Sequence, residues 1–247
     1  MYSKYMLGLS LSVLGIAPMS GHARDYPVAT HCQDSMASKK DWASLFDGKT
    51  LNGWHCFNGK GNTIACWAVE DGCLVDLGPK DDAASGGDIV SDAVYDNFEL
   101  EWEWKCEKGS NSGVMYHVRE GVQFHGTSET GPEYQIIDDV TFPYPIFEWQ
   151  KTGADYAMTP PNTSSKELKP IGEWNTSKII FDKGHVEHWL NGKRIVEFEA
   201  WTPEWERNVR TGKWQSYPYY GRAKSGSIAL QNHGNKTYFK NIRIKQL

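Results

Sequence analysis

The sequence predicts an all-β protein, a sandwich of two antiparallel sheets in a single domain. Three observations lead to this prediction. Apolar and polar residues alternate in several short runs, glycine-containing turns separate the runs, and helical periodicity is scarce. Strict alternation over a few residues is typical of a strand with one buried face, and many short strands joined by turns are typical of a sandwich or barrel.

Most of the expected strands follow directly from this alternation. The clearest is 98–105, where FELEWEWK alternates apolar and charged side chains. Further strands are expected at 113–119, 134–138, 194–199, 227–232 and 237–245, the last two as a closing pair.

Two tight turns mark consecutive hairpins. The runs 177–181 and 185–190 flank Asp182-Lys-Gly184, and Asn191-Gly192 follows. Both turns contain residues that adopt positive φ, as two-residue hairpin turns require. One short helix or turn is expected at 202–209. The segment 141–170, rich in Pro, Tyr, Thr and Asn, is expected to be a long irregular loop of the kind that often covers a binding site.

The N-terminus has the order of a secretory signal peptide. Lys4 precedes a mostly apolar run that ends at Ala17, and small residues flank His22 as a cleavage site requires. The run is shorter than the roughly 20 residues that span a bilayer. We therefore expect residues 1–23 to be a signal peptide, residues 24–40 a disordered lead-in, and the mature protein to be periplasmic or secreted.

Composition argues against two classes of partner. The formal net charge is −5, whereas nucleic acid needs a basic face that neutralises phosphates, and an anionic membrane surface likewise attracts basic segments. Eleven Trp and twelve Tyr supply rings that can fill a core or stack on the C–H faces of sugars. Five cysteines leave one over in an exported protein, and a bridge among Cys56, Cys66 and Cys73 is one option.

Eight short motifs follow one another along the chain. They are WASLFDGKTLNGW at 42–54, WAVEDGCL at 67–74, NSGVMY at 111–116, EYQI at 133–136, EWN at 173–175, HWLNG at 188–192, GSIALQNHG at 226–234 and YFKNIRI at 238–244. In this order they resemble the 3-keto-disaccharide hydrolase family. The resemblance covers residues 41–247.

This resemblance implies both a fold and a chemistry. The fold is a concanavalin-like jelly-roll β-sandwich. The chemistry is cleavage of glycosides already oxidised to a ketone at sugar carbon 3, aided by a divalent metal ion. An oxidoreductase that forms the ketone is then an expected functional partner. This chain departs from the family at one position, because His117 stands where many members have Arg.

Strand alternation places two polar pairs where a sugar can bind. Glu133 and Gln135 share one face of their strand, and Gln231 and His233 share one face of theirs. A carboxylate, an imidazole and two carboxamides suit a sugar, and they also offer oxygen and nitrogen ligands to one cation. Candidate substrate-binding residues are Gln135, Gln231, Tyr116, Asn111 and Tyr156, and candidate metal ligands are Glu133, His117 and His188.

A ketone at C3 acidifies the C2–H bond, so a base can remove that proton and the C1 substituent can leave by β-elimination. His233 is assigned to proton transfer, because imidazole titrates near about pH 6.5 without tuning. Glu133 is assigned to metal or substrate, since a carboxyl base needs its pKa raised. These two roles can be exchanged.

Two other functions compete with this reading. A non-catalytic carbohydrate-binding module needs only the aromatic and amide side chains. An ordinary glycoside hydrolase needs two carboxylates at a set separation. Gln135 stands where a second acid beside Glu133 is expected, but Glu101 and Glu103 form a same-face pair elsewhere.

Overall fold

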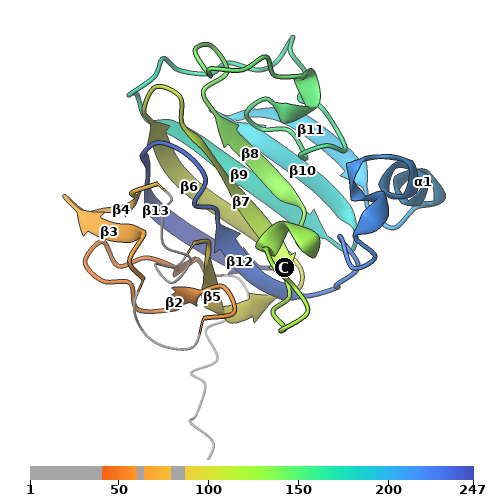
Figure 1. Ribbon diagram of the computed structural model, residues 1–247, viewed down its shortest axis with the longest axis horizontal. Coiled ribbons are helices and arrows are strands. Elements are labelled where there is room, and N and C mark those ends of the chain that lie inside the picture. The colour runs from red at the N-terminus through yellow and green to blue at the C-terminus, as the bar shows by residue number, and fades with distance from the viewer. Residues whose placement is uncertain (1–40, 60–63, 79–86) are drawn as a thin grey trace, which may run out of the picture. The chain divides into compact units, whose positions relative to one another are not determined.

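The computed structural model describes residues 41–59, 64–78 and 87–247, so the predicted signal peptide and lead-in lie outside the described residues. The described chain forms a sandwich of two antiparallel sheets with one α-helix, as the sequence predicts (Figure 1). The larger sheet has the order β11 (Lys193–Glu199), β10 (His185–Leu190), β9 (Asn175–Asp182), β6 (Phe98–Cys106), β13 (Thr237–Gln246), β4 (Cys73–Asp76) and β3 (Trp67–Glu70), with β1 (Ala43–Ser44) paired to β13.

The smaller sheet carries the motifs of greatest interest. Its order is β2 (Trp54–Cys56), β5 (Ile89–Tyr95), β12 (Gly226–Leu230), β7 (Asn111–Val118) and β8 (Glu133–Ile137). Beyond β8, residues 153–156 extend this sheet through backbone hydrogen bonds and an isolated bridge between Tyr134 and Asp155. The edge of the sheet next to β8 is therefore built by the predicted irregular loop.

Large side chains from both sheets fill the space between them. In β6 every second residue is buried, so Trp102 and Trp104 point into the core while Glu101 and Glu103 point outward. Trp102 meets Tyr134 of β8 edge to face, with ring centroids 5.0 Å apart. Such geometry suits the ring quadrupoles and adds to the burial of apolar area.

Both predicted hairpin turns are present. Lys183 and Gly184 join β9 to β10 with φ of 53° and 102°, and Asn191 and Gly192 join β10 to β11 with φ of 47° and 81°. Two successive residues with positive φ give the turn the twist that antiparallel strands need.

The predicted closing pair is wrong. β12 pairs with β5 and β7 in the smaller sheet, whereas β13 pairs with β4, β6 and β1 in the larger one. Residues 231–236 thus cross from one sheet to the other. Neighbouring strands in sequence usually pair when a tight turn joins them, and this connection is longer than such a turn.

The predicted helix forms as α1 (Pro203–Thr211). The Thr202 side chain accepts a hydrogen bond from the Trp205 backbone N–H, and Pro203 occupies the first turn, where its missing N–H costs nothing. Short 3-10 helices occur at η1 (Thr127–Glu129), η2 (Glu148–Gln150) and η3 (Lys213–Ser216). No helix among the described residues is long and apolar enough to cross a membrane.

Candidate active site

The outward face of the smaller sheet gathers the predicted polar pairs. Gln135 pairs with Gly113 of β7, and the Gln231 backbone N–H donates to the Gly113 carbonyl at 3.0 Å. Residues directly opposite each other in a ladder point to the same face. Glu133, Gln135 and Gln231 therefore share the outward face, as the alternation predicts, while Tyr134 and Ile136 lie in the core.

Glu133 lies over a glycine that leaves room for its carboxyl group. A Cβ atom placed on Gly113 would lie only 2.2 Å from Glu133 Oε1 and 2.8 Å from its Cδ. The Glu133 side chain is buried, and Oε1 has no hydrogen-bond partner. A buried polar atom without a partner is uncommon and points to a role other than stability.

The surroundings of Glu133 change its acidity. Burial raises the pKa of Glu133 to about 8, the charge of Lys213 opposes this rise, and Asp88 adds to it. Burial dominates because a charged carboxylate loses its hydration there. Glu133 thus retains a proton near neutral pH and loses it just above, which suits a group that transfers protons.

Lys213 and Tyr156 reach Glu133 from two distant segments. The Tyr156 backbone N–H donates to the Glu133 carbonyl at 3.0 Å, so the predicted substrate-binding residue Tyr156 lies beside the acid. Lys213 Nζ, from η3, lies 4.1 Å from the centre of the Tyr156 ring and 4.7 Å from that of Trp214. No sequence motif singles out Lys213, because it lies in η3, far along the chain from the polar pairs.

A chain of hydrogen bonds links the amides to the imidazole. Gln135 Nε2 donates to Asn111 Oδ1 at 2.9 Å, and Asn111 Nδ2 lies 2.9 Å from His233 Nδ1. An amide nitrogen only donates, so His233 Nδ1 accepts and the neutral ring holds its proton on Nε2. His233 is exposed, which leaves this Nε2–H free to meet a substrate.

Two aspartates that the sequence did not single out fix the turn before His233. Asp88 Oδ1 accepts the Asn232 backbone N–H at 3.0 Å, and Asp76 Oδ1 accepts the Asn232 side-chain amide. Burial raises the pKa of Asp76 to about 7, and burial also raises that of Asp88. Thr127 donates its hydroxyl hydrogen to Asp88 Oδ2. The position of His233 therefore depends on acids outside the motifs.

Comparison with known proteins places the chain in a family. Residues 41–245 match the family described as the 3-keto-alpha-glucoside-1,2-lyase-like domain. The chain belongs to this family. A 3-keto-disaccharide hydrolase of Bacteroides thetaiotaomicron is 33% identical over 235 residues, which cover 83% of this chain and 78% of the relative.

Solved structures agree with this membership. A Parabacteroides distasonis protein described as a candidate glycosyl hydrolase is 42% identical with a TM-score of 0.77, covering 83% of this chain and 94% of that one. A second protein so described, from the same organism, is 24% identical with a TM-score of 0.61, covering 84% of this chain and 100% of that one. At that identity the likeness shows the fold alone.

Three of the predicted site residues, Tyr116, His117 and His188, do not lie on the outward face with Glu133. Tyr116 is buried in the core, because Val114 and Tyr116 alternate with the outward Gly113 and Met115. The predicted substrate contact by Tyr116 is therefore corrected.

The predicted ligand set of Glu133, His117 and His188 is likewise not brought together. His117 Nε2 lies 2.8 Å from the Asp96 carbonyl and its ring packs on Phe181, while His188 Nδ1 lies 3.0 Å from the Gly153 carbonyl inside the sandwich. Burial lowers the pKa of each imidazole to about 4.

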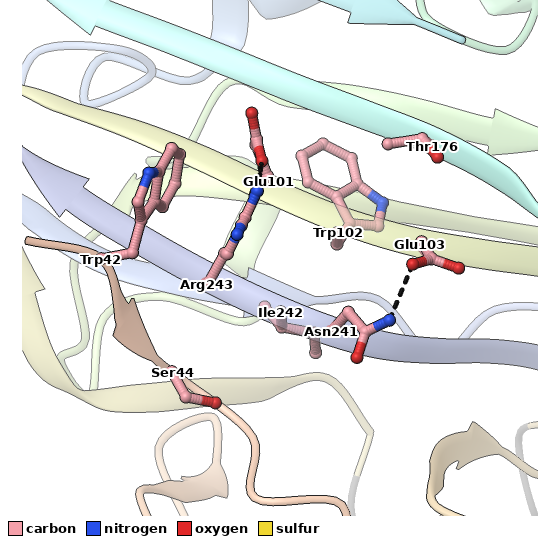
Figure 2. Close-up of a pocket in the computed structure, with 9 residues that line it drawn as sticks. All are labelled: Trp42, Ser44, Glu101, Trp102, Glu103, Thr176, Asn241, Ile242 and Arg243. Atoms are coloured by element: carbon pink, nitrogen blue, oxygen red, sulfur yellow. Dashed lines mark hydrogen bonds and ion pairs between the residues drawn. The ribbon is translucent and has the colours of Figure 1, made fainter.

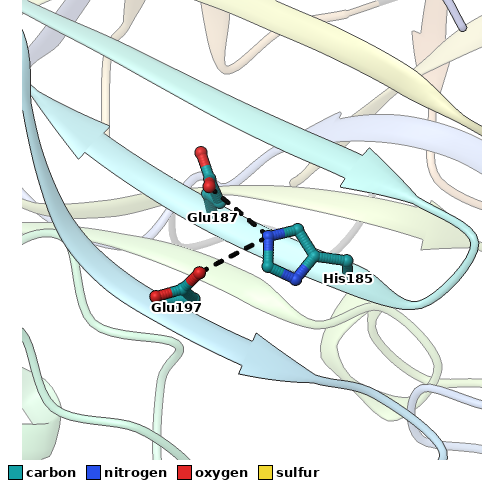
Figure 3. A group of neighbouring side chains, drawn as sticks. All are labelled: His185, Glu187 and Glu197. Carbon is teal, nitrogen blue, oxygen red and sulfur yellow. Dashed lines mark hydrogen bonds and ion pairs between the residues drawn. The ribbon is translucent and has the colours of Figure 1, made fainter.

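The described residues do not gather three close His, Cys, Asp or Glu ligand atoms at Glu133, and the metal that the family resemblance implies stays a prediction. Within the described ranges, the one group of three close His, Cys, Asp or Glu ligand atoms is His185, Glu187 and Glu197 on β10 and β11 (Figure 3). There Arg194 Nη1 already lies 2.8 Å from a carboxylate oxygen of each glutamate. The mechanism that we propose uses no metal ion.

The glutamate pair of the two-carboxylate alternative lies on the outward face of the other sheet. Glu101 and Glu103 line a cavity of about 490 Å³ beside Trp42, at a bulge in β13 (Figure 2). Arg243 Nη2 lies 2.6 Å from Glu101 Oε2, and the Asn241 amide donates to Glu103 at 2.7 Å. Each carboxylate already has a partner, so neither is arranged as a free acid catalyst.

Proposed function

We propose that the protein cleaves 3-keto-glycosides by removing the C2 proton and eliminating the C1 substituent, after which water adds to give net hydrolysis. The observation that carries this proposal is Glu133, a buried carboxyl with a pKa raised to about 8 on the face where Asn111 holds His233. Membership of the family and the name of the Bacteroides relative support the substrate class.

Glu133 is the base in this proposal. Its ionised form takes the C2 proton, and the electron pair of that bond is delocalised onto the C3 oxygen as an enolate. The Lys213 ammonium group and the His233 Nε2–H stabilise the negative charge on that oxygen. This exchanges the two roles first assigned from the sequence, because the hydrogen bond from Asn111 occupies His233 Nδ1 and leaves Nε2 as a donor.

The second half of the reaction returns the proton. The enolate electrons form a double bond between C1 and C2, and the C1–O bond breaks with its electron pair going to the leaving oxygen. That oxygen takes the proton held by Glu133. Water then adds across the double bond, its hydroxyl to C1 and its hydrogen to C2, so the sum of both steps is hydrolysis. We assign Gln135 and Gln231 to hydrogen bonds with the sugar hydroxyls.

A second candidate is ordinary two-carboxylate hydrolysis with Asp88 as the partner of Glu133. One observation favours it, since Asp88 raises the pKa of Glu133 and therefore interacts with it. However, Asp88 Oδ1 and Oδ2 already accept hydrogen bonds from Asn232 and Thr127. A buried carboxyl group with a strongly raised pKa on a face with several polar side chains also favours catalysis over a non-catalytic binding module.

In this proposal the substrate of the protein is the product of an earlier oxidation. A ketone at C3 forms only when an oxidoreductase removes hydrogen from a C3 hydroxyl, so such an enzyme must supply the substrate. The signal-like N-terminus supports a site of action in the periplasm or outside the cell.

The direct experiment is turnover of one glucoside in its 3-keto and unoxidised forms, with and without EDTA, by the wild type and by Glu133→Gln. We expect cleavage of the 3-keto form only, and a loss of about 10²- to 10⁴-fold in Glu133→Gln. Equal cleavage of the unoxidised form would favour the Asp88 alternative. Loss of activity in EDTA, restored by one divalent cation, would mean that a metal supplies the charge that we assign to Lys213 and His233.

A further inference from the structure

Three aromatic rings lead away from Glu133 along the loop that follows β8. Tyr156 and Trp149 have ring centroids 5.8 Å apart with planes at 70°, and Trp149 and Phe147 are stacked at 5.3 Å and 12°. We call Tyr156, Trp149 and Phe147 the aromatic ladder. Tyr156 lies directly opposite Glu133 across the edge of β8, so the side chains of these two residues lie on the same face of the sheet.

The ladder is held in place by its own loop. Gln150 Oε1 accepts the Phe147 N–H at 3.0 Å, and Gln150 Nε2 donates to the Tyr156 hydroxyl at 3.4 Å. The Ala157 N–H donates to the Trp149 carbonyl at 3.2 Å. Phe147 nevertheless remains 65% exposed, with Trp149 covering one face of its ring. The rings are thus fixed before any ligand arrives, and an apolar face is left open.

The ladder and the polar groups flank Glu133 on opposite sides. β8 has β7 along one edge and residues 153–156 along the other. Asn111 lies on β7, and Gln231 and His233 follow the end of β12, whereas Tyr156 lies across the other edge of β8. A sugar that is held by the polar groups, with its C1–C2 bond at Glu133, therefore has the aromatic ladder on the side away from those groups.

We propose that the aromatic ladder binds the leaving group of the substrate and selects leaving groups that carry a ring with an apolar face. Such a face is found on a second pyranose, through its C–H groups, and on an aromatic aglycone. The proposal rests on the proposed function. Phe147 offers no hydrogen bond, so this subsite selects ring shape over hydroxyl pattern.

The test compares three 3-keto glucosides whose leaving groups are methanol, phenol and a second glucose, using the full chain. Phe147→Ala removes a mostly exposed ring, so the fold is not threatened. We expect KM to rise about 2- to 10-fold for the phenyl glucoside, the disaccharide or both, with kcat unchanged, as loss of about 0.5–1.5 kcal/mol of stacking predicts. The methyl glucoside is expected to be unaffected. Tyr144→Ala, on the same loop and 72% exposed, is the matched control.

A change confined to the phenyl glucoside identifies an aromatic aglycone, and a change confined to the disaccharide identifies a sugar. Equal loss on all three substrates, or no loss on any, would overturn the proposal.

A separate measurement keeps this test independent of the reaction. Calorimetric titration with unoxidised phenyl and methyl glucosides is expected to show tighter binding of the phenyl form and loss of that preference in Phe147→Ala. If 3-keto turnover fails while this preference persists, the proposed function is wrong and the ladder stands. No preference in the wild type would overturn the ladder.

Discussion

Gly113→Ala tests whether the position of the Glu133 carboxyl controls the reaction. The new Cβ would lie 2.2 Å from Oε1, so the carboxyl must move by about 1 Å or more to reach ordinary contact. A displacement of about 1 Å at a reacting group can cost about 100-fold in rate. We therefore expect kcat/KM on a 3-keto glycoside to fall about 100-fold.

Stability is expected to change little in the same variant. Alanine in a strand is favoured over glycine by about 0.5–1 kcal/mol, and this offsets part of the cost of moving the carboxyl. Gly126→Ala is the matched control, because its Cβ would meet only Ser128 Oγ, at 3.9 Å, in extended backbone. Thermal unfolding and steady-state kinetics on both variants give the answer. Unchanged kcat/KM in a folded Gly113→Ala protein would refute the role given to the carboxyl position.

Three further predictions concern charge, stability and export. Lys213→Met removes the charge that lowers the pKa of Glu133, so the rising limb of kcat/KM against pH is expected to move to higher pH. Asp88→Asn removes a charge that raises this pKa, so the limb is expected to move to lower pH. Unchanged limbs in both variants would show that Glu133 is not the titrating base. The pKa of Glu133 rises from 4.5 to about 8 on folding, so its contribution to stability is present below about pH 4.5 and is lost as pH rises through about 8. Glu133→Gln should therefore be more thermally stable than the wild type above pH 8. An equal or lower melting temperature there would contradict the raised pKa. Mass spectrometry of protein from the native host is expected to find an N-terminus near Arg24, and an intact Met1 would exclude cleavage.

Local patterns in the sequence were sufficient for the strands and for the outward polar face. Alternation alone put Glu133 and Gln135 on one side of β8, and the structure confirms it. The same rule gives the inward direction of Tyr116, because it lies five positions after the outward Asn111 and an odd offset changes the face. Its expected substrate contact came from the motif rather than from the strand phase.

Other parts of the site depend on long-range packing. Lys213 of η3 lowers the pKa of Glu133, and Asp76 of β4 and Asp88, which precedes β5, both bond Asn232. The alternation within a single strand carries no information about such long-range contacts. The raised pKa of Glu133 follows from burial, which only the assembled fold produces, and for this reason the sequence pointed to His233 as the base instead.

The fate of the C2 proton distinguishes elimination from direct cleavage of the C1–O bond. A 3-keto glucoside is incubated with the enzyme in heavy water, and recovered substrate and product are examined by NMR for deuterium at C2. We expect deuterium at C2 in the product, and its absence when Glu133 is replaced by Gln. Cleavage that leaves the C2–H bond untouched, at equal rates for the oxidised and unoxidised glycosides, would contradict it.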